Sequence, residues 1–269
     1  MSEYIRGRPH KERFPGKRAM DLHIHTEHSV DCDTKVKQVL RVAEKHGFGI
    51  SITDHNAIGG SLEALKQDVV PVVPGIEITA AEGIDVLCYF KDKDTLVRFF
   101  DEDIKPNMKN NLFRSSRLKG EEVIARAKKL GGVTAFAHPY RYILRLYSVA
   151  STLPVIKKYF SIFDAVEVIN GKSPQVLNRR ALRKAQLFNK PFMSGSDAHE
   201  LSDLMVTFTL FDSDDPAEVV ESIRNGDTIV IGRGSKALLK LLRSGKKIIV
   251  KKYNEATHKG KGAQAAEQH

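Results

Sequence analysis

The segment Met20-Asp-Leu-His-Ile-His-Thr26 decides the interpretation of this 269-residue chain. Polar and apolar residues alternate from Asp21 to His25, as they do in a half-buried β-strand, and residues two apart on a strand point to the same face. We therefore expect His23 and His25 to leave one face at the end of a strand. Two neutral imidazoles placed in this way can bind one metal ion, because histidine nitrogen is a common ligand of Zn²⁺ and similar ions. For this pair alone, an ordinary surface strand is the alternative.

Four further strand-like runs end on side chains that bind metals. Residues 49–55, 69–77, 133–138 and 191–199 each pass from an apolar pattern to a polar end. A polar residue that caps a loop would explain any one of them. Five strand ends that use only histidine and acidic residues favour a metal site instead. These ends carry Asp54 and His55, Glu77, His138 before a proline, and Asp197 with His199.

The ordered set His-x-His, Thr-Asp-His, Pro-Gly-Ile-Glu, Ala-His-Pro and Ser-Asp-Ala-His resembles the polymerase and histidinol phosphatase (PHP) superfamily of metal-dependent phosphoesterases. The resemblance covers residues 20–233. It implies an α/β fold, a distorted seven-stranded (β/α)7 barrel similar to a TIM barrel, with the metal cluster at the C-terminal ends of the strands. It also implies two to three divalent ions (Zn²⁺, Mn²⁺ or Fe²⁺) and eight ligands: His23, His25, Asp31, His55, Glu77, His138, Asp197 and His199.

The resemblance further implies how these ligands are grouped. Glu77 is expected to bridge the first two ions. The first site would use His23, His25, Glu77 and Asp197, the second would add His138, and the third would use Asp31, His55 and His199.

The chain departs from the family pattern at two positions. Asp31 stands where several relatives carry histidine, and a carboxylate binds the same metals. Asp85 stands where many relatives carry another histidine, and no histidine lies between Glu77 and His138. We therefore expect water, Asp85 or substrate to complete the second site.

Several other residues are candidates for the chemistry. Asp54 is expected to orient an imidazole or relay a proton. Arg141, three residues after His138, is expected to bind a phosphate oxygen at the catalytic centre, and Asn170 ends a strand that faces the same mouth. The polar segment 105–119, with Arg114 and Arg117, is interpreted either as a phosphate-binding lid or as a surface connection.

The periodicity predicts repeated β/α units and a parallel sheet. Helices are expected over 34–45, 61–67, 121–130, 176–189, 215–225 and 237–243. Strands are expected to end near Thr26, His55, Glu77, Phe90, His138, Asn170 and Asp197.

Composition favours one barrel-sized domain with basic extensions. An apolar content of 41% is sufficient for a core, two cysteines form no disulfide framework, and no run approaches the roughly 18 apolar residues of a membrane span. With a charged N-terminus, we expect a cytoplasmic protein that has no membrane partner. The net charge of +10 is concentrated in extensions 1–19 and 234–269, which flank the barrel at 20–233. These ends either bind nucleic acid phosphates or act as solubilising tails, and the last residues are expected to be disordered.

The chemistry expected of such a cluster is phosphate ester hydrolysis by a metal-bridging hydroxide. The sequence has neither a P-loop nor a Gly-x-Ser-x-Gly elbow, so serine chemistry has no support. We predict a PHP-type hydrolase, a phosphatase or phosphodiesterase that acts on a small phosphorylated metabolite or a nucleotide. A nuclease that uses the basic termini is the alternative, and a non-catalytic metal-binding module is a third hypothesis.

Overall fold

The computed structural model describes residues 2–7, 14–109, 115–140 and 157–235. They belong to one compact unit that ends at Gly234. A second unit, Ser235–His269, lies outside the described residues except for Ser235, and so does the predicted helix 237–243.

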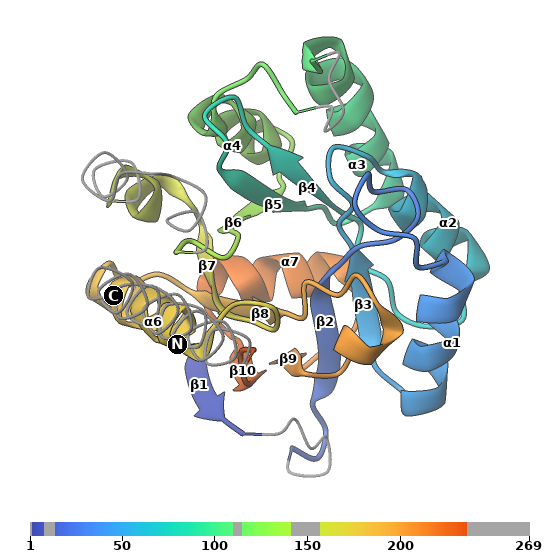
Figure 1. Ribbon diagram of the computed structural model, residues 1–269, viewed down its shortest axis with the longest axis vertical. Helices are drawn as coiled ribbons and strands as arrows, with labels where there is room; N and C mark the ends of the chain where they lie inside the picture. The colour runs from blue at the N-terminus through green and yellow to red at the C-terminus, as the bar shows by residue number, and fades with distance from the viewer. Residues whose placement is uncertain (1, 8–13, 110–114, 141–156, 236–269) are drawn as a thin grey trace, which may run out of the picture. The chain divides into compact units, whose positions relative to one another are not determined.

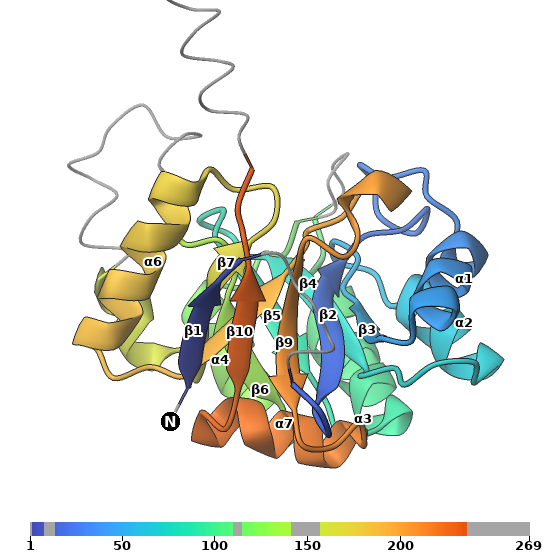
Figure 2. The same ribbon diagram turned by 90° about the horizontal axis from the view of Figure 1, so that it is seen from below.

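The strands form two five-stranded sheets (Figures 1 and 2). The first sheet has the order β1-β10-β9-β2-β3, with β1 Glu3–Arg6, β2 Arg18–Ile24, β3 Gly49–Ile52, β9 Thr207–Phe211 and β10 Ile229–Gly232. The second sheet has the order β4-β5-β6-β7-β8, with β4 Gly75–Thr79, β5 Asp85–Tyr89, β6 Val133–Phe136, β7 Ala165–Asn170 and β8 Phe192–Gly195.

Isolated bridges connect the two sheets. Ile50 pairs with Val72 and His55 with Glu77 on one side, and Ile24 pairs with Ala198 on the other. The mixed α/β class is therefore confirmed, and the seven predicted strands correspond to β2–β8. The ladders between them do not form one continuous closed barrel.

The expectation of a parallel sheet is wrong for part of the fold. The pairs β2–β3, β6–β7 and β7–β8 are parallel, whereas β4–β5 and β5–β6 are antiparallel. Only residues 80–84 separate β4 from β5, and a parallel pair needs a crossover of a dozen or more residues.

Helices α1 Val36–His46, α2 Gly59–Gln67, α3 Lys93–Arg98, α4 Gly120–Lys129 and α6 Gln175–Leu187 cover the outer faces of the sheets. Helix α7 spans Pro216–Asn225, and residues 157–162 are also helical. Short turns of other helix types span Phe99–Ile104, Lys105–Asn107 and Leu201–Asp203. In the part of the chain that the structure describes, no helix has the length and apolar character needed to cross a membrane.

An apolar cluster between the sheets fills one end of the molecule. Met20, Leu22 and Tyr89 belong to it, and Val219 and Ile223 of α7 close it. In Figure 2, α7 lies across the end of the sheets where β2 begins. The opposite end, where β2 finishes, is therefore left for polar residues.

A bulge in β2 directs His23 into this opposite end. Met20 and Leu22 belong to the interior cluster, so simple alternation would place His23 on the outer face. The register between β2 and β3 shifts between Asp21 and Ile24, and Ile24 packs in the outer cluster beside α1. Leu22 and His23 both face inward as a result, which is how bulges re-aim side chains at functional sites.

Candidate metal centre

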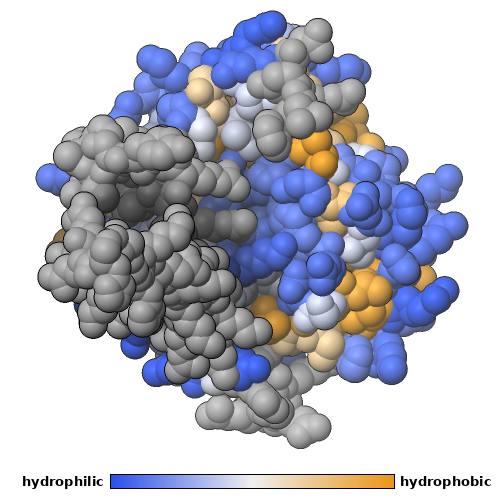
Figure 3. All heavy atoms as spheres, in the orientation of Figure 1, coloured by the Kyte–Doolittle hydropathy of each residue, from blue (hydrophilic) through white to orange (hydrophobic). Residues whose placement is uncertain are grey.

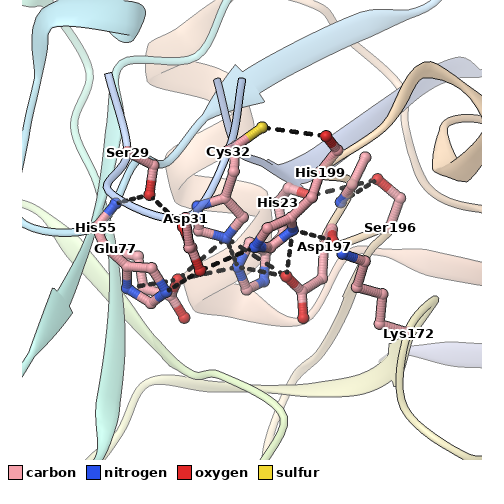
Figure 4. A network of polar contacts seen from close by, with 12 residues as sticks. His23, Ser29, Asp31, Cys32, His55, Glu77, Lys172, Ser196, Asp197 and His199 are labelled. Carbon is pink, nitrogen blue, oxygen red and sulfur yellow. Dashed lines mark hydrogen bonds and ion pairs between the residues drawn. The ribbon is translucent and has the colours of Figure 1, made fainter. Parts of the chain in front are cut away.

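Glu77 lies at the centre of a buried group of histidines (Figure 4). Its Oε2 is 3.2 Å from His23 Nε2 and 3.3 Å from both His25 Nε2 and His55 Nδ1. Its Oε1 is 3.2 Å from His138 Nε2. Burial alone would raise the pKa of this carboxyl, but the charges of His55 and His23 hold the pKa well below its usual value. Glu77 is therefore an anion that faces four imidazoles.

His23, His25 and Asp197 form one convergence of possible ligands. The two Nε2 atoms are 3.1 Å apart, and Asp197 Oδ1 is 3.4 Å from His25 Nε2 and 4.0 Å from His23 Nε2. Ligand atoms about 2.1 Å from one ion lie roughly 3.0–4.2 Å from each other, depending on the angle between them. The spacing therefore fits a single divalent ion.

Further groups share the same residues. The ligand atoms of His23, Glu77 and His138 lie within 4.8 Å of one another, as do those of His25, His55 and Glu77. A group of His25, Asp31 and His199 follows, in which His199 Nε2 is 3.0 Å from Asp31 Oδ2. The structure thus brings all eight predicted ligands into one cluster.

The protonation of His23 suits a metal ligand. Its Nδ1 lies 2.9 Å from Glu167 Oε1, so this nitrogen donates to the carboxylate, and in the neutral ring the lone pair of Nε2 faces the cluster. The Nδ1 of His25 is buried without a hydrogen-bond partner in the described structure, while its Nε2 faces the carboxylates. Imidazole and carboxylate donors together suit Zn²⁺, Mn²⁺ and Fe²⁺. The residues present therefore fit divalent ions.

The carboxylates of the cluster raise the pKa values of its histidines. Burial would lower the pKa of His23, but Glu77, Glu167 and Asp197 raise it well above its usual value. For His25, hydrogen bonds to Asp197 and Glu77 likewise overcome burial and raise the pKa to about 9. Without metal, protons neutralise these carboxylates, and a divalent cation would do so in their place.

Asp31 is held in the cluster by the loop after β2. Ser29 Oγ donates to Asp31 Oδ1 at 2.7 Å, and His55 Nε2 lies 3.7 Å from Oδ2. Burial would raise the pKa of Asp31, but the hydrogen bond from His199 and the charge of His55 lower it. The thiol of Cys32 donates to the carbonyl of His199 at 3.2 Å, which ties the two loops together.

Glu167 is a site residue that the sequence prediction did not include. Besides His23, it accepts hydrogen bonds from the His138 backbone N–H at 2.7 Å and from Asn170 Nδ2 at 3.0 Å. It is fully buried in β7. An acidic residue between Val166 and Val168 in an otherwise apolar strand was the signal for it.

Asp21 was quoted in the sequence motif without a role. It is fully buried and accepts hydrogen bonds from the backbone N–H groups of Ser196 at 2.8 Å and His23 at 3.4 Å. Burial raises its pKa to about 7. The residue joins the end of β8 to β2 directly beneath the histidine pair.

Two predicted residues, Asp54 and Asn170, make contacts that support the cluster. The carboxylate of Asp54 accepts hydrogen bonds from the N–H and hydroxyl of Thr26, at 2.6 and 2.8 Å, and thereby holds the turn after β2. The amide of Asn170 donates to Asp197 Oδ2 at 3.2 Å as well as to Glu167. Asn170 therefore fixes a cluster carboxylate.

The remaining predicted residues lie at the edge of the cluster or outside the described residues. Asp85 Oδ2 is 3.9 Å from His138 Nε2, and its Oδ1 accepts from Thr79 at 2.8 Å. Arg117 is exposed, whereas Arg114 and Arg141 lie outside the described residues. Hydrophilic residues occupy the middle of the face seen in Figure 3.

The chain belongs to the PHP-domain family: residues 21–169 match the PHP domain, and residues 176–228 match the PHP-associated domain. The cluster described above lies within these two regions. No curated protein sequence matches the chain significantly.

Solved structures with the same fold have low sequence identity to this chain. A two-domain protein of Bacteroides vulgatus that contains a predicted PHP-like metal-dependent phosphoesterase is 17% identical, with a TM-score of 0.59 over 81% of this chain and 66% of that one. The lesion-specific endonuclease Q of Pyrococcus furiosus is 17% identical, with a TM-score of 0.60 over 80% of this chain and 57% of its own. PsfC of Pseudomonas syringae PB-5123 is 15% identical, with a TM-score of 0.58 over 86% of this chain and 97% of its own. At such identities the likeness establishes the fold.

Proposed function

We propose that this protein is a metal-dependent phosphoesterase that hydrolyses the phosphate ester of a small phosphorylated metabolite or a nucleotide. The observation that carries the proposal is the position of Glu77, which lies within 3.3 Å of nitrogen atoms from four histidines in a buried cluster. Membership of the PHP-domain family supports phosphate esters as the class of substrate.

Two to three divalent ions, drawn from Zn²⁺, Mn²⁺ and Fe²⁺, would be held by the eight clustered ligands. Bound ions of this kind lower the pKa of a coordinated water and stabilise charge on phosphoryl oxygens. Glu77 would be shared between neighbouring ions, because its two oxygens face different histidines.

The protein's own groups would keep these ligands in position. Glu167 fixes the ring of His23 and the backbone of His138, and Asn170 fixes Asp197. Strands β2–β8 would act as the distorted seven-stranded barrel of the family, with the isolated bridges as its two seams. Arg117 and Arg141 are proposed to bind substrate phosphate.

A nuclease is the second candidate. The fold of endonuclease Q matches 80% of this chain, and the charge of the sequence is concentrated at its basic ends. A phosphodiester bond of a nucleic acid would be hydrolysed at the same cluster.

A substrate panel tests the proposal. Phosphate monoesters, phosphodiesters and short oligonucleotides would be offered to protein loaded with Mn²⁺, Zn²⁺ or Fe²⁺. We expect hydrolysis of a small ester, abolished in Glu77→Gln and retained in Glu218→Gln, which changes an exposed carboxylate on α7. Hydrolysis of oligonucleotides alone would favour the nuclease. No turnover of any ester by the metal-loaded protein, or full activity in Glu77→Gln, would contradict the proposal.

A further inference from the structure

Helix α6 carries only positive charge. Its residues Gln175–Leu187 include Arg179, Arg180, Arg183 and Lys184 and no acidic residue. The three arginines are exposed, and none of them forms an ion pair with another described residue. Arg179 and Arg183 are four residues apart, as are Arg180 and Lys184, and like charges at this spacing destabilise a helix. This charge pattern therefore lowers the stability of the helix.

Arginines on three other helices form ion pairs. Arg98, the last residue of α3, pairs with Glu102 at 3.2 Å. On α4, Arg126 pairs with Asp103 at 3.0 Å, and on α7 Arg224 pairs with Glu221. The arginines of α6 have no such partner among the described residues, so they leave a local excess of positive potential.

A lysine that precedes α6 lies at the edge of the ligand cluster. Lys172 lies in the short loop between β7 and α6, and its Nζ is 3.6 Å from Asp203 Oδ2. The same carboxylate oxygen accepts from the backbone N–H of His199 at 3.4 Å. Figure 4 shows the Lys172 side chain directed toward Asp197. Lys172 is thus a cation at the edge of the cluster, one turn before α6 starts.

Helix α6 is tied to the cluster through Asn178. The side chain of Asn178 accepts from the Asn170 backbone N–H at 3.3 Å and donates to the Asn170 carbonyl at 3.0 Å. Since the Asn170 amide donates to Asp197, the turn of α6 that precedes Arg179 lies next to a residue that contacts the cluster.

We propose that Lys172 and the exposed arginines of α6 bind the backbone phosphates of a nucleic acid strand next to the metal centre. The identity of the strand as substrate rests on the proposed phosphoesterase function, but its binding does not require turnover. Successive cations along α6 match a ligand with repeated phosphates better than they match a single phosphate group.

Two features of the surface favour this partner and this helix. Leu177, Ala181 and Ala185 of α6 are buried in the core, and the exposed apolar residues Val176 and Leu187 lie near its two ends, so the exposed middle of the helix is cationic. Helix α1 also carries exposed cations, but the exposed acid Glu44 lies among them.

The test compares charge-matched variants of two helices. R179Q/R180Q/R183Q removes three cations from α6, and K37Q/R41Q/K45Q removes three exposed cations from α1. Binding of labelled single-stranded and duplex oligonucleotides would be measured by fluorescence anisotropy over a range of salt concentrations, with anionic lipid vesicles as a parallel ligand. Thermal unfolding shows whether each variant is folded. If the triple variant is unfolded, the single variants R180Q and K172Q are used in its place.

We expect the α6 variant to lower oligonucleotide affinity by at least about tenfold and to reduce the log–log salt slope by roughly two units, since each lost phosphate contact contributes about 0.7–0.9. The single variants should each lower the slope by about 0.7, and the α1 variant should keep the wild-type slope. Equal losses in both helices, no loss in the α6 variant, no binding by the wild type, or a loss seen only with vesicles would overturn the proposal. Strand binding that is lost in the α6 variant, together with no ester hydrolysis by the wild type, would support the α6 site and contradict only the proposed function.

Discussion

Glu167 sets the chemical state of His23. Its carboxylate accepts from Nδ1, so once the ring has lost its second proton the lone pair of Nε2 is available to a metal. It also accepts from the His138 backbone, which couples two ligands to one buried acid.

Replacing Glu167 by Gln keeps the shape and removes the charge. We expect metal affinity to fall by about 10–100-fold, the usual loss when a group that orients a metal ligand is changed. Competition with a metal chelator measures the affinity, and Glu218→Gln on the surface of α7 is the control. Unchanged affinity in Glu167→Gln would show that His23 is positioned by other contacts.

Metal binding should release protons. The carboxylates raise the pKa of His25 to about 9 and that of His23 well above its usual value, so both imidazoles are protonated in the metal-free protein near pH 7. A metal needs the neutral ring, so affinity should rise between pH 7 and 9 by about tenfold per pH unit for each proton displaced. Calorimetry in buffers of different protonation enthalpy counts these protons. Absence of proton release over this range would contradict the charge balance described here.

The same shifts affect the metal-free fold. For a histidine whose pKa is raised on folding, the added stability is fully present below the unfolded value of 6.5 and is lost as the pH rises through the folded value, about 9 for His25. Apo protein should therefore lose stability between those limits.

Most residues of the cluster could be predicted from the sequence because they follow strand patterns in a recognisable ordered set, whereas Asp31 was predicted only from the family resemblance. Glu167 and Asp21 lie inside strands, where the sequence offers only an acid among apolar residues. Their roles depend on residues of other strands. Glu167 of β7 contacts His23 of β2, and Asp21 of β2 accepts from Ser196 after β8. The same reason explains Asn170: its strand end was predicted, but its bond to Asp197 was not.

At the scale of elements, the bulge in β2 directs His23 into the cluster. The alternating pattern correctly placed His23 and His25 on the same face. It did not predict that Leu22 and His23 both face inward, which results from the shift in strand pairing between Asp21 and Ile24. Such a shift is a property of strand pairing, which residue types along one strand do not determine.

Gly195 makes this arrangement sterically feasible. A Cβ at Gly195 would lie 2.2 Å from His23 Cβ and 2.8 Å from the His23 backbone nitrogen. Gly195→Ala should therefore displace β2 at His23, lowering stability by about 1–3 kcal/mol and reducing metal content. Gly7→Ala is the control, because nothing lies within 4 Å of its added Cβ. Normal unfolding and normal metal content in Gly195→Ala would be inconsistent with this packing.

The N-terminus is part of the sheet. Strand β1 pairs in parallel with β10, and Ser2 Oγ bonds to Gly226 and accepts from the Phe192 N–H at 2.9 Å. Deleting residues 1–7 should lower the stability by at least about 2 kcal/mol, or roughly 4–8 °C in Tm. Calorimetry of the truncated chain measures the loss, and an unchanged Tm would show that β1 adds nothing. A test of the basic ends must therefore neutralise charges while leaving β1 in place.

At the scale of the whole molecule, the two ends of the sheets have different roles. Helix α7 and the interior apolar cluster close one end, and the ligand cluster occupies the other. This division explains how histidines and acids can be buried without disrupting the core: they lie beyond it, where the strand ends of both sheets converge. It also makes the fold and the metal site interdependent, since bound ions would stabilise the native state by mass action.

Metal content is the measurement that tests the central claim most directly. The protein would be reconstituted with Mn²⁺, Zn²⁺ or Fe²⁺, freed of unbound ions and subjected to elemental analysis beside Glu77→Gln. We predict about two to three divalent ions per wild-type chain, and a clear loss in Glu77→Gln while its circular dichroism remains that of the wild type. Fewer than about one ion per wild-type chain after reconstitution would contradict the proposed metal centre.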